Sequence, residues 1–138
     1  MFNWFLAANL LYGDSGLVKL ADFGLARKQV GGRYFYTNNV VTLWYRAPEL
    51  LLGQKKYLYS VDMWSVGCIM AELIIGKPIF KGAKEAQQLQ LIYEKCGNPT
   101  EEIWPGVTSL PYFGTLGPKQ DYPKKLNEYM LQFDPKLD

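Results

Sequence analysis

The stretch that decides the fold runs from Asp22-Phe23-Gly24 to Ala47-Pro48-Glu49, with 22 residues between the two tripeptides. Before it, two short apolar runs at 10–12 and 17–20 flank the turn Gly13-Asp14-Ser15-Gly16, a pattern that predicts a β-hairpin. Residues 27–39, between the tripeptides, are polar and lack periodicity. They predict a long exposed loop, and such loops in small domains are commonly functional.

Helical patterns dominate the rest of the chain. Residues 48–52 predict a short helix that begins at a proline and ends at Gly53. Asp62 is the expected N-cap of a helix over 62–75, whose apolar residues lie on more than one face, which is typical of a buried helix. Further helices are expected at 84–95 and 124–133, with mostly coil over 100–123. The expected fold class is therefore mainly α with a short β-hairpin.

Composition excludes several classes of protein. The 138 residues are 49% hydrophobic with a net charge of +2, which argues against a disordered chain and against a strongly basic nucleic-acid binder. The absence of histidine excludes catalysis by histidine and histidine-ligated metals. Cys68 and Cys96 form no CxxC pair, so we expect no zinc site and a reducing compartment. The apolar run at 63–75 is too short to span a bilayer, so we expect a soluble intracellular protein.

Positive charge gathers over residues 19–57, which hold seven basic and two acidic side chains, a local balance of +5. This segment is either a solvated basic loop or a surface that meets phosphate or an acidic partner.

Taken together, the two tripeptides, the preceding hairpin and the following helix resemble the catalytic C-lobe of a eukaryotic protein kinase, over residues 8–138. The segments 42–49 (TLWYRAPE) and 62–68 (DMWSVGC) look like those of a cyclin-dependent kinase. The resemblance implies a partial kinase domain (α+β) over 1–138, with the end of the catalytic loop, the activation segment, the buried helix 62–75, the helix 84–95 and a C-lobe insert. Residues 1–8 diverge from the family.

The resemblance implies ATP and Mg²⁺ as cofactors. Asp22 would chelate the Mg²⁺ that bridges the ATP phosphates, and Asn9, 13 residues earlier, matches the second metal ligand. The alternatives are a turn carboxylate for Asp22 and a plain turn or cap residue for Asn9.

Other roles also come from the resemblance. Thr37 aligns with the activating phosphothreonine, or is an ordinary loop threonine, and Arg27 matches one of the arginines that hold the phosphate. Val40, Val41 and Arg46 match the region that accepts proline after the phosphorylated Ser or Thr. Glu49 and Asp62 would be structural, and in the family an arginine from a later helix pairs with the carboxylate at Glu49.

The segment 96–113 is similar to the insert of transcription-associated cyclin-dependent kinases, which phosphorylate the tail of RNA polymerase II. Its Trp104, Tyr112 and Phe113 could equally be core aromatics. A cyclin and a Ser/Thr-Pro protein substrate are the implied partners, with no direct nucleic acid and no membrane. The subfamily implies a nuclear location, with a cytoplasmic one left open.

The first residues depart from the family. Where the catalytic loop should read His-Arg-Asp-Leu-Lys-Pro-x-Asn, residues 2–9 read FNWFLAAN. Trp4 occupies the place of the catalytic base, and an indole can donate a hydrogen bond but cannot act as that base. Leu6 and Asn3 replace a lysine and an arginine, so charge stabilisation of the transition state is lost as well.

The 138 residues also contain no GxGxxG loop, so the N-lobe is expected to be absent and ATP binding weak. We expect this chain alone to be inactive, with the helix 62–75 partly uncovered, and whether it is an enzyme stays open. Three hypotheses remain, namely a truncated Ser/Thr kinase, a non-catalytic pseudokinase-like binding fragment, and a fragment with no function as a folded protein.

Overall fold

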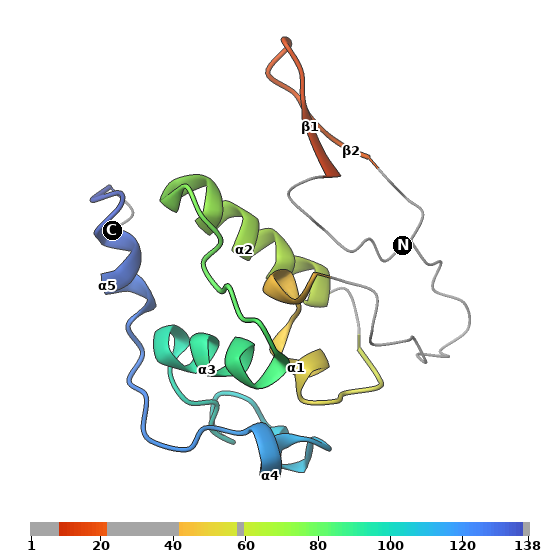
Figure 1. Cartoon of the computed structure of the whole chain (residues 1–138), viewed down its shortest axis with the longest axis vertical. Helices are drawn as coiled ribbons and strands as arrows, with labels where there is room; N and C mark the ends of the chain where they lie inside the picture. The colour runs from red at the N-terminus through yellow and green to blue at the C-terminus, as the bar shows by residue number, and fades with distance from the viewer. Residues whose placement is uncertain (1–8, 22–41, 58–59, 137–138) are drawn as a thin grey trace.

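The computed structural model describes residues 9–21, 42–57 and 60–136 of the chain (Figure 1). This part is mostly helical and carries one two-stranded antiparallel sheet, as the sequence predicts. Within these ranges no helix is both long and apolar enough to cross a membrane. In chain order the elements are β1 (Leu10–Tyr12), β2 (Val18–Leu20), the 3-10 helix η2 (Leu43–Tyr45), α1 (Pro48–Leu51), α2 (Ser60–Ile75), α3 (Glu85–Cys96), the 3-10 helix η3 (Val107–Ser109), α4 (Phe113–Leu116) and α5 (Leu126–Leu131).

The predicted hairpin is confirmed. Leu10 faces Leu20 across the ladder and Tyr12 faces Val18, so the two strands close on the turn at residues 13–16. Gly16 adopts a φ of 73°, a left-handed conformation that glycine reaches without strain. Figure 1 shows the hairpin reaching away from the helices, and its residues 11–20 are all exposed.

The helix α2 corrects two expectations. It begins at Ser60, so Asp62 is not its N-cap but lies buried inside its first turn, where a carboxylate still complements the helix dipole. Full burial is also wrong, because Met63, Met70 and Leu73 are 65%, 59% and 79% exposed. The expectation of a partly uncovered helix is borne out.

The predicted end of α2 at Gly76 is confirmed. Gly76 has a φ of 79° and donates its N–H to the carbonyl of Glu72.

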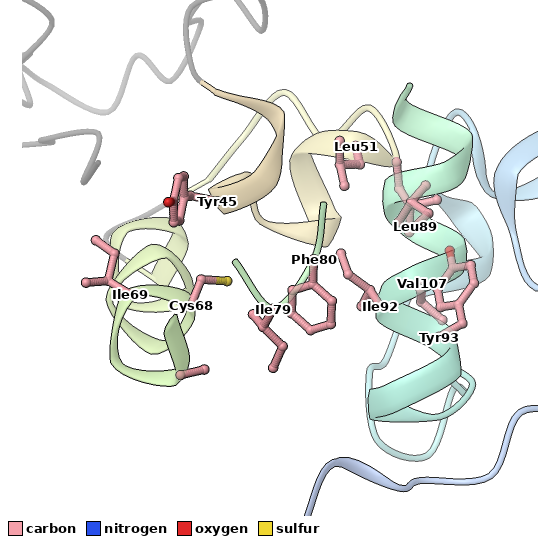
Figure 2. Packing of buried hydrophobic residues seen from close by; sticks show 12 residues of the cluster. Tyr45, Leu51, Cys68, Ile69, Ile79, Phe80, Leu89, Ile92, Tyr93 and Val107 are labelled. Carbon is pink, nitrogen blue, oxygen red and sulfur yellow. The ribbon is translucent and has the colours of Figure 1, made fainter. Parts of the chain in front are cut away.

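The main core lies between α2 and α3 (Figure 2). The connecting segment places Ile79 and Phe80 between the two helices, and Leu89 and Val107 are completely buried on the α3 side. A half-buried Trp64 from α2 stacks on Phe80, with 5.9 Å between ring centroids. The segment between α2 and α3 is therefore part of the core.

The segment after α3 folds back along that helix. The backbone N–H of Asn98 donates to the carbonyl of Tyr122 (3.1 Å), and the backbone N–H of Lys125 donates to the carbonyl of Lys95 (2.9 Å). The segment is mostly coil, as predicted, apart from η3 and the single turn of α4. These hydrogen bonds bring α5 beside the end of α3.

The three aromatic residues of this segment differ in burial. Trp104 and Phe113 are half-buried and pack against the main core, whereas Tyr112 is 50% exposed. The Tyr112 ring lies against Gly53, where a Cβ atom would come within 2.8 Å of it. Two of the three therefore take the packing role that the sequence left open.

Candidate active site

Asn9 lies at the open end of the hairpin. Its carbonyl accepts a hydrogen bond from the backbone N–H of Ala21 at 2.8 Å, which extends the pairing of β1 with β2 by one step. Asp22, the next residue in the chain, lies outside the described residues. The hairpin thus brings Asn9 beside the residue that precedes Asp22. An amide oxygen such as that of Asn9 is a ligand that Mg²⁺ accepts, so this described residue fits the cation by type.

Arg46 is buried directly after η2. Its Nη1 atom donates to Oε1 of Glu85 at 2.8 Å, an ion pair that links η2 to the first turn of α3 across 39 residues of sequence. The side chain of Arg46 is 8% exposed and that of Glu85 is 48% exposed, so the pair reaches from the interior to the surface. Beside it a hollow of about 570 Å³ is lined also by Leu43, Lys84 and Leu116.

A second set of hydrogen bonds holds η2 against α3. The completely buried Gln88 donates from Nε2 to the carbonyl of Trp44 and accepts the backbone N–H of Gly82 at Oε1. Trp44 in turn donates from Nε1 to the carbonyl of Gly82 at 3.0 Å. The three residues thus close a cycle of three hydrogen bonds. The sequence shows Gln88 only as one polar residue of an amphipathic helix, so its role was missed.

On its other side, η2 is held by α2. The Tyr45 hydroxyl donates to Oε2 of Glu72 at 2.6 Å, and Ser65 Oγ donates to the backbone carbonyl of Tyr45 at 2.9 Å. Burial, and then the neighbouring Glu72 carboxylate, raise the pKa of Tyr45 far above its ordinary value, so the phenol stays protonated. Residues 43–46 are therefore clamped between α2 and α3.

Glu49 lies in the first turn of α1 and is half-buried. Burial raises the pKa of its carboxyl, and no salt bridge within the described residues neutralises it. It lines a hollow of about 320 Å³ together with Gln54, Ser60 and Trp104. The structural role expected for Glu49 therefore includes an energetic cost at neutral pH, as a half-buried charge requires.

The remaining residues singled out from the sequence lie outside the described residues. They are Asn3, Trp4, Leu6, Asp22, Arg27, Thr37, Val40 and Val41. Of the residues assigned to the metal site, the phosphate cluster and the proline pocket, the structure thus places Asn9 and Arg46.

Comparison with known proteins identifies the family. The model of the protein kinase domain matches residues 7–137. Cyclin-dependent kinase C-1 of Oryza sativa subsp. japonica is 51% identical over 128 residues, which are 92% of this chain and 25% of that protein. Cyclin-dependent kinase 11B of Homo sapiens is 51% identical over 114 residues, 79% of this chain and 14% of that protein.

A solved structure shares the fold. The crystal structure of the yeast RNA Pol II CTD kinase CTDK-1 complex contains a chain that superposes with a TM-score of 0.86 at 40% identity, over 94% of this chain and 43% of that one.

The present chain spans about a quarter of the length of the cyclin-dependent kinases C-1 that it matches in Oryza sativa and Arabidopsis thaliana. The resemblance drawn from residues 42–49 and 62–68 is confirmed. The chain belongs to the protein kinase domain family, and its relatives within that family are cyclin-dependent kinases.

Proposed function

We propose that this chain is part of a cyclin-dependent Ser/Thr protein kinase, which transfers the γ-phosphate of ATP to Ser or Thr followed by Pro. The observation that carries the proposal is the match of the kinase domain to residues 7–137. The similarity to the chain of the CTD kinase complex supports it independently at the level of the fold.

The open end of the hairpin is the proposed metal site. Bound ATP supplies the phosphoryl group, and its Mg²⁺ would be held by the side-chain oxygens of Asn9 and Asp22. The 2.8 Å hydrogen bond between Ala21 and Asn9 supports this assignment, because it ties the two ends of the hairpin together next to Asp22. The hairpin would act as a rigid support for two metal ligands.

The clamped segment 43–46 is the proposed floor of the substrate site. The side chains of Tyr45 and Arg46 donate to Glu72 and Glu85. Gln88 donates to the backbone carbonyl of Trp44, so the segment is held from two sides. Val40, Val41 and Arg46 would receive the substrate proline. Thr37 would be the activating phosphorylation site, with Arg27 among the groups that hold its phosphate.

The substrate and partner follow from the same relatives. The tail of RNA polymerase II is the proposed substrate, because the solved structure that shares this fold is that of an RNA Pol II CTD kinase complex. A cyclin is the proposed partner, since the similar proteins are cyclin-dependent kinases. A nuclear location would accompany this substrate.

A second candidate function is a non-catalytic binding module. Trp4 favours it, because an indole stands where the family has its proton-accepting aspartate. Leu6 adds to this, because it supplies no charge to the transferred phosphate. In this form the 138-residue chain would bind Ser/Thr-Pro proteins without phosphorylating them.

One experiment tests both candidates. The 138-residue chain is titrated with a fluorescent Ser-Pro peptide and with the matched Ser-Ala peptide, and each mixture is then given labelled Mg²⁺-ATP. We expect tighter binding of the Ser-Pro peptide and no phosphoryl transfer. Equal binding of the two peptides would contradict the proposed Ser/Thr-Pro specificity. Transfer that Asp22→Ala abolishes would rule out the non-catalytic candidate.

A further inference from the structure

Two interactions hold the carboxylate of Glu85 in place. Its side chain is 48% exposed, yet its Oε1 atom accepts a hydrogen bond of 2.8 Å from Nη1 of the buried Arg46. It also lies in the first turn of α3, where the helix dipole favours a negative charge. The carboxylate is therefore bound to the interior of the chain although it lies at the surface.

The start of α3 is fixed by side chains of its own first turns. Gln88 accepts the backbone N–H of Gly82 at 2.8 Å. Gln87 accepts the backbone N–H of Ala83, also at 2.8 Å. A Cβ atom at Gly82 would lie 2.6 Å from the backbone nitrogen of Gln88, so this part of the chain passes very close to the helix. The position of Glu85 relative to the segment before α3 is thereby set.

One face of α3 holds both the backbone and a side chain of the segment 43–46. Glu85 and Gln88 are three residues apart in the helix, a spacing that places them on the same face. Gln88 donates from Nε2 to the carbonyl of Trp44 at 3.1 Å, while Glu85 accepts from Arg46. Because a guanidinium is planar and rigid, this bond restricts the orientation of its plane relative to the backbone of Trp44.

The ion pair forms part of the wall of the hollow of about 570 Å³. Apart from Lys84, the rest of this wall is apolar and consists of Leu43, Ala83, Ala86 and Leu116. The stem of an arginine is apolar and the face of its guanidinium is flat, so an oriented Arg46 offers a surface on which a proline ring packs. An alanine has less apolar area to bury there and gains less from that orientation.

We propose that Glu85 is a positioning residue for the selection of proline after the phosphorylated Ser or Thr. It acts through Arg46, whose guanidinium it holds in the orientation that receives the proline ring. The inference rests on the proposed function, which places Arg46 in the proline site. It extends that site to a residue of α3 that lies 39 residues later in the chain than Arg46.

The test measures how strongly Glu85→Gln and the wild-type chain prefer a fluorescent Ser-Pro peptide over the matched Ser-Ala peptide. The preference is the ratio of the two dissociation constants. An unfolded fraction of the chain weakens both peptides equally and cancels in this ratio, so a loss of stability alone does not change it. We expect Glu85→Gln to lower the preference about two- to fivefold, the range for an ion pair with a half-exposed partner.

Two control variants should leave the preference unchanged. Glu102→Gln removes an exposed carboxylate elsewhere on the chain. Ile79→Val removes one buried methylene from the core and so lowers stability without removing a hydrogen bond.

Arg46→Met tests whether Glu85 acts through Arg46. Methionine keeps an apolar stem but removes the guanidinium, so this variant should itself lower the preference for Ser-Pro. In the Arg46→Met background, Glu85→Gln should then change the ratio no further, because the group that it positions is gone. Circular dichroism and urea unfolding establish that each variant is folded, and should Arg46→Met not fold, Glu85→Gln and its two controls still decide the question.

Three results would overturn the inference. One is an unchanged preference in Glu85→Gln, another is an equal loss of preference in Ile79→Val, and the third is an undiminished effect of Glu85→Gln in the Arg46→Met background. A wild-type chain that binds the two peptides equally would instead overturn the proposed Ser/Thr-Pro specificity, and this inference with it.

Discussion

Arg46 and Glu85 form a 2.8 Å ion pair that joins the end of η2 to the start of α3. Glu85→Gln keeps the shape of the side chain and removes its charge, which leaves the buried guanidinium without this carboxylate. We expect the free energy of unfolding to fall by about 1 kcal/mol, the upper end of the range for exposed pairs, because the outer partner is half-exposed. Urea unfolding measures this, and Glu102→Gln at an exposed site is the control. An equal effect of the two variants would mean that the pair contributes nothing.

Glu49 should destabilise the chain at neutral pH. Because burial raises the pKa of its carboxyl, the folded state holds the proton more tightly than the unfolded state, and ionisation above that pKa costs stability. Glu49→Gln mimics the protonated form, so it should unfold at higher urea concentration than the wild type at pH 7. The difference in stability between the variant and the wild type should vanish below pH 4, because Glu49 is then protonated in both the folded and the unfolded state. A variant less stable at pH 7 would show that a cation pairs with Glu49.

The buried thiol of Cys68 predicts a loss of stability in alkali. Burial is the first cause that raises the pKa of Cys68 to about 12 from an ordinary value of 9.0, so the unfolded state releases its proton first as the pH rises. Between pH 9 and 10 this residue should contribute a downward slope of at most about 1.4 kcal/mol per pH unit. In Cys68→Ala the free energy of unfolding, measured by urea unfolding at each pH, should fall less steeply over this range. An unchanged slope would contradict the assignment.

Two glycines should respond to alanine in opposite ways. Gly67 is inside α2 with open space at its Cβ position, so Gly67→Ala should raise the free energy of unfolding by about 0.5–1 kcal/mol. At Gly82 the Cβ atom would lie 2.6 Å from the backbone nitrogen of Gln88. Gly82→Ala should therefore lower the free energy of unfolding by about 1–3 kcal/mol. Thermal unfolding of both variants measures this. A destabilised Gly67→Ala would contradict the open space found there.

Local signals in the sequence predict much of this fold. The turn before β2 and the glycine after α2 act through the backbone of a few residues, so Gly16 and Gly76 could be placed in advance. The predicted start of α2 was wrong because Asp62 is a good capping residue by type, whereas the helix begins two residues earlier, at Ser60.

Contacts between distant residues could not be predicted in the same way. Gln88 is buried because its partner Trp44 is 44 residues away in the chain, and a polar residue in an amphipathic helix gives no sign of that. Likewise the resemblance gives Arg46 a place in the substrate site but does not reveal Glu85 beside it. The apolar pattern of α2 cannot tell which side other elements cover, so a partly uncovered helix was expected but Met70 could not be singled out as exposed.

The most direct test of the proposed metal site is whether Asn9 and Asp22 share one cation. Mn²⁺ with ADP broadens nearby amide signals even when binding is weak, so titration into the ¹⁵N-labelled chain reports the site of the metal. We predict selective broadening of Asn9 and Ala21, which are hydrogen-bonded to each other, and its loss in Asp22→Asn. Broadening elsewhere with Asn9 and Ala21 unaffected, or broadening that persists in Asp22→Asn, would contradict a shared metal site.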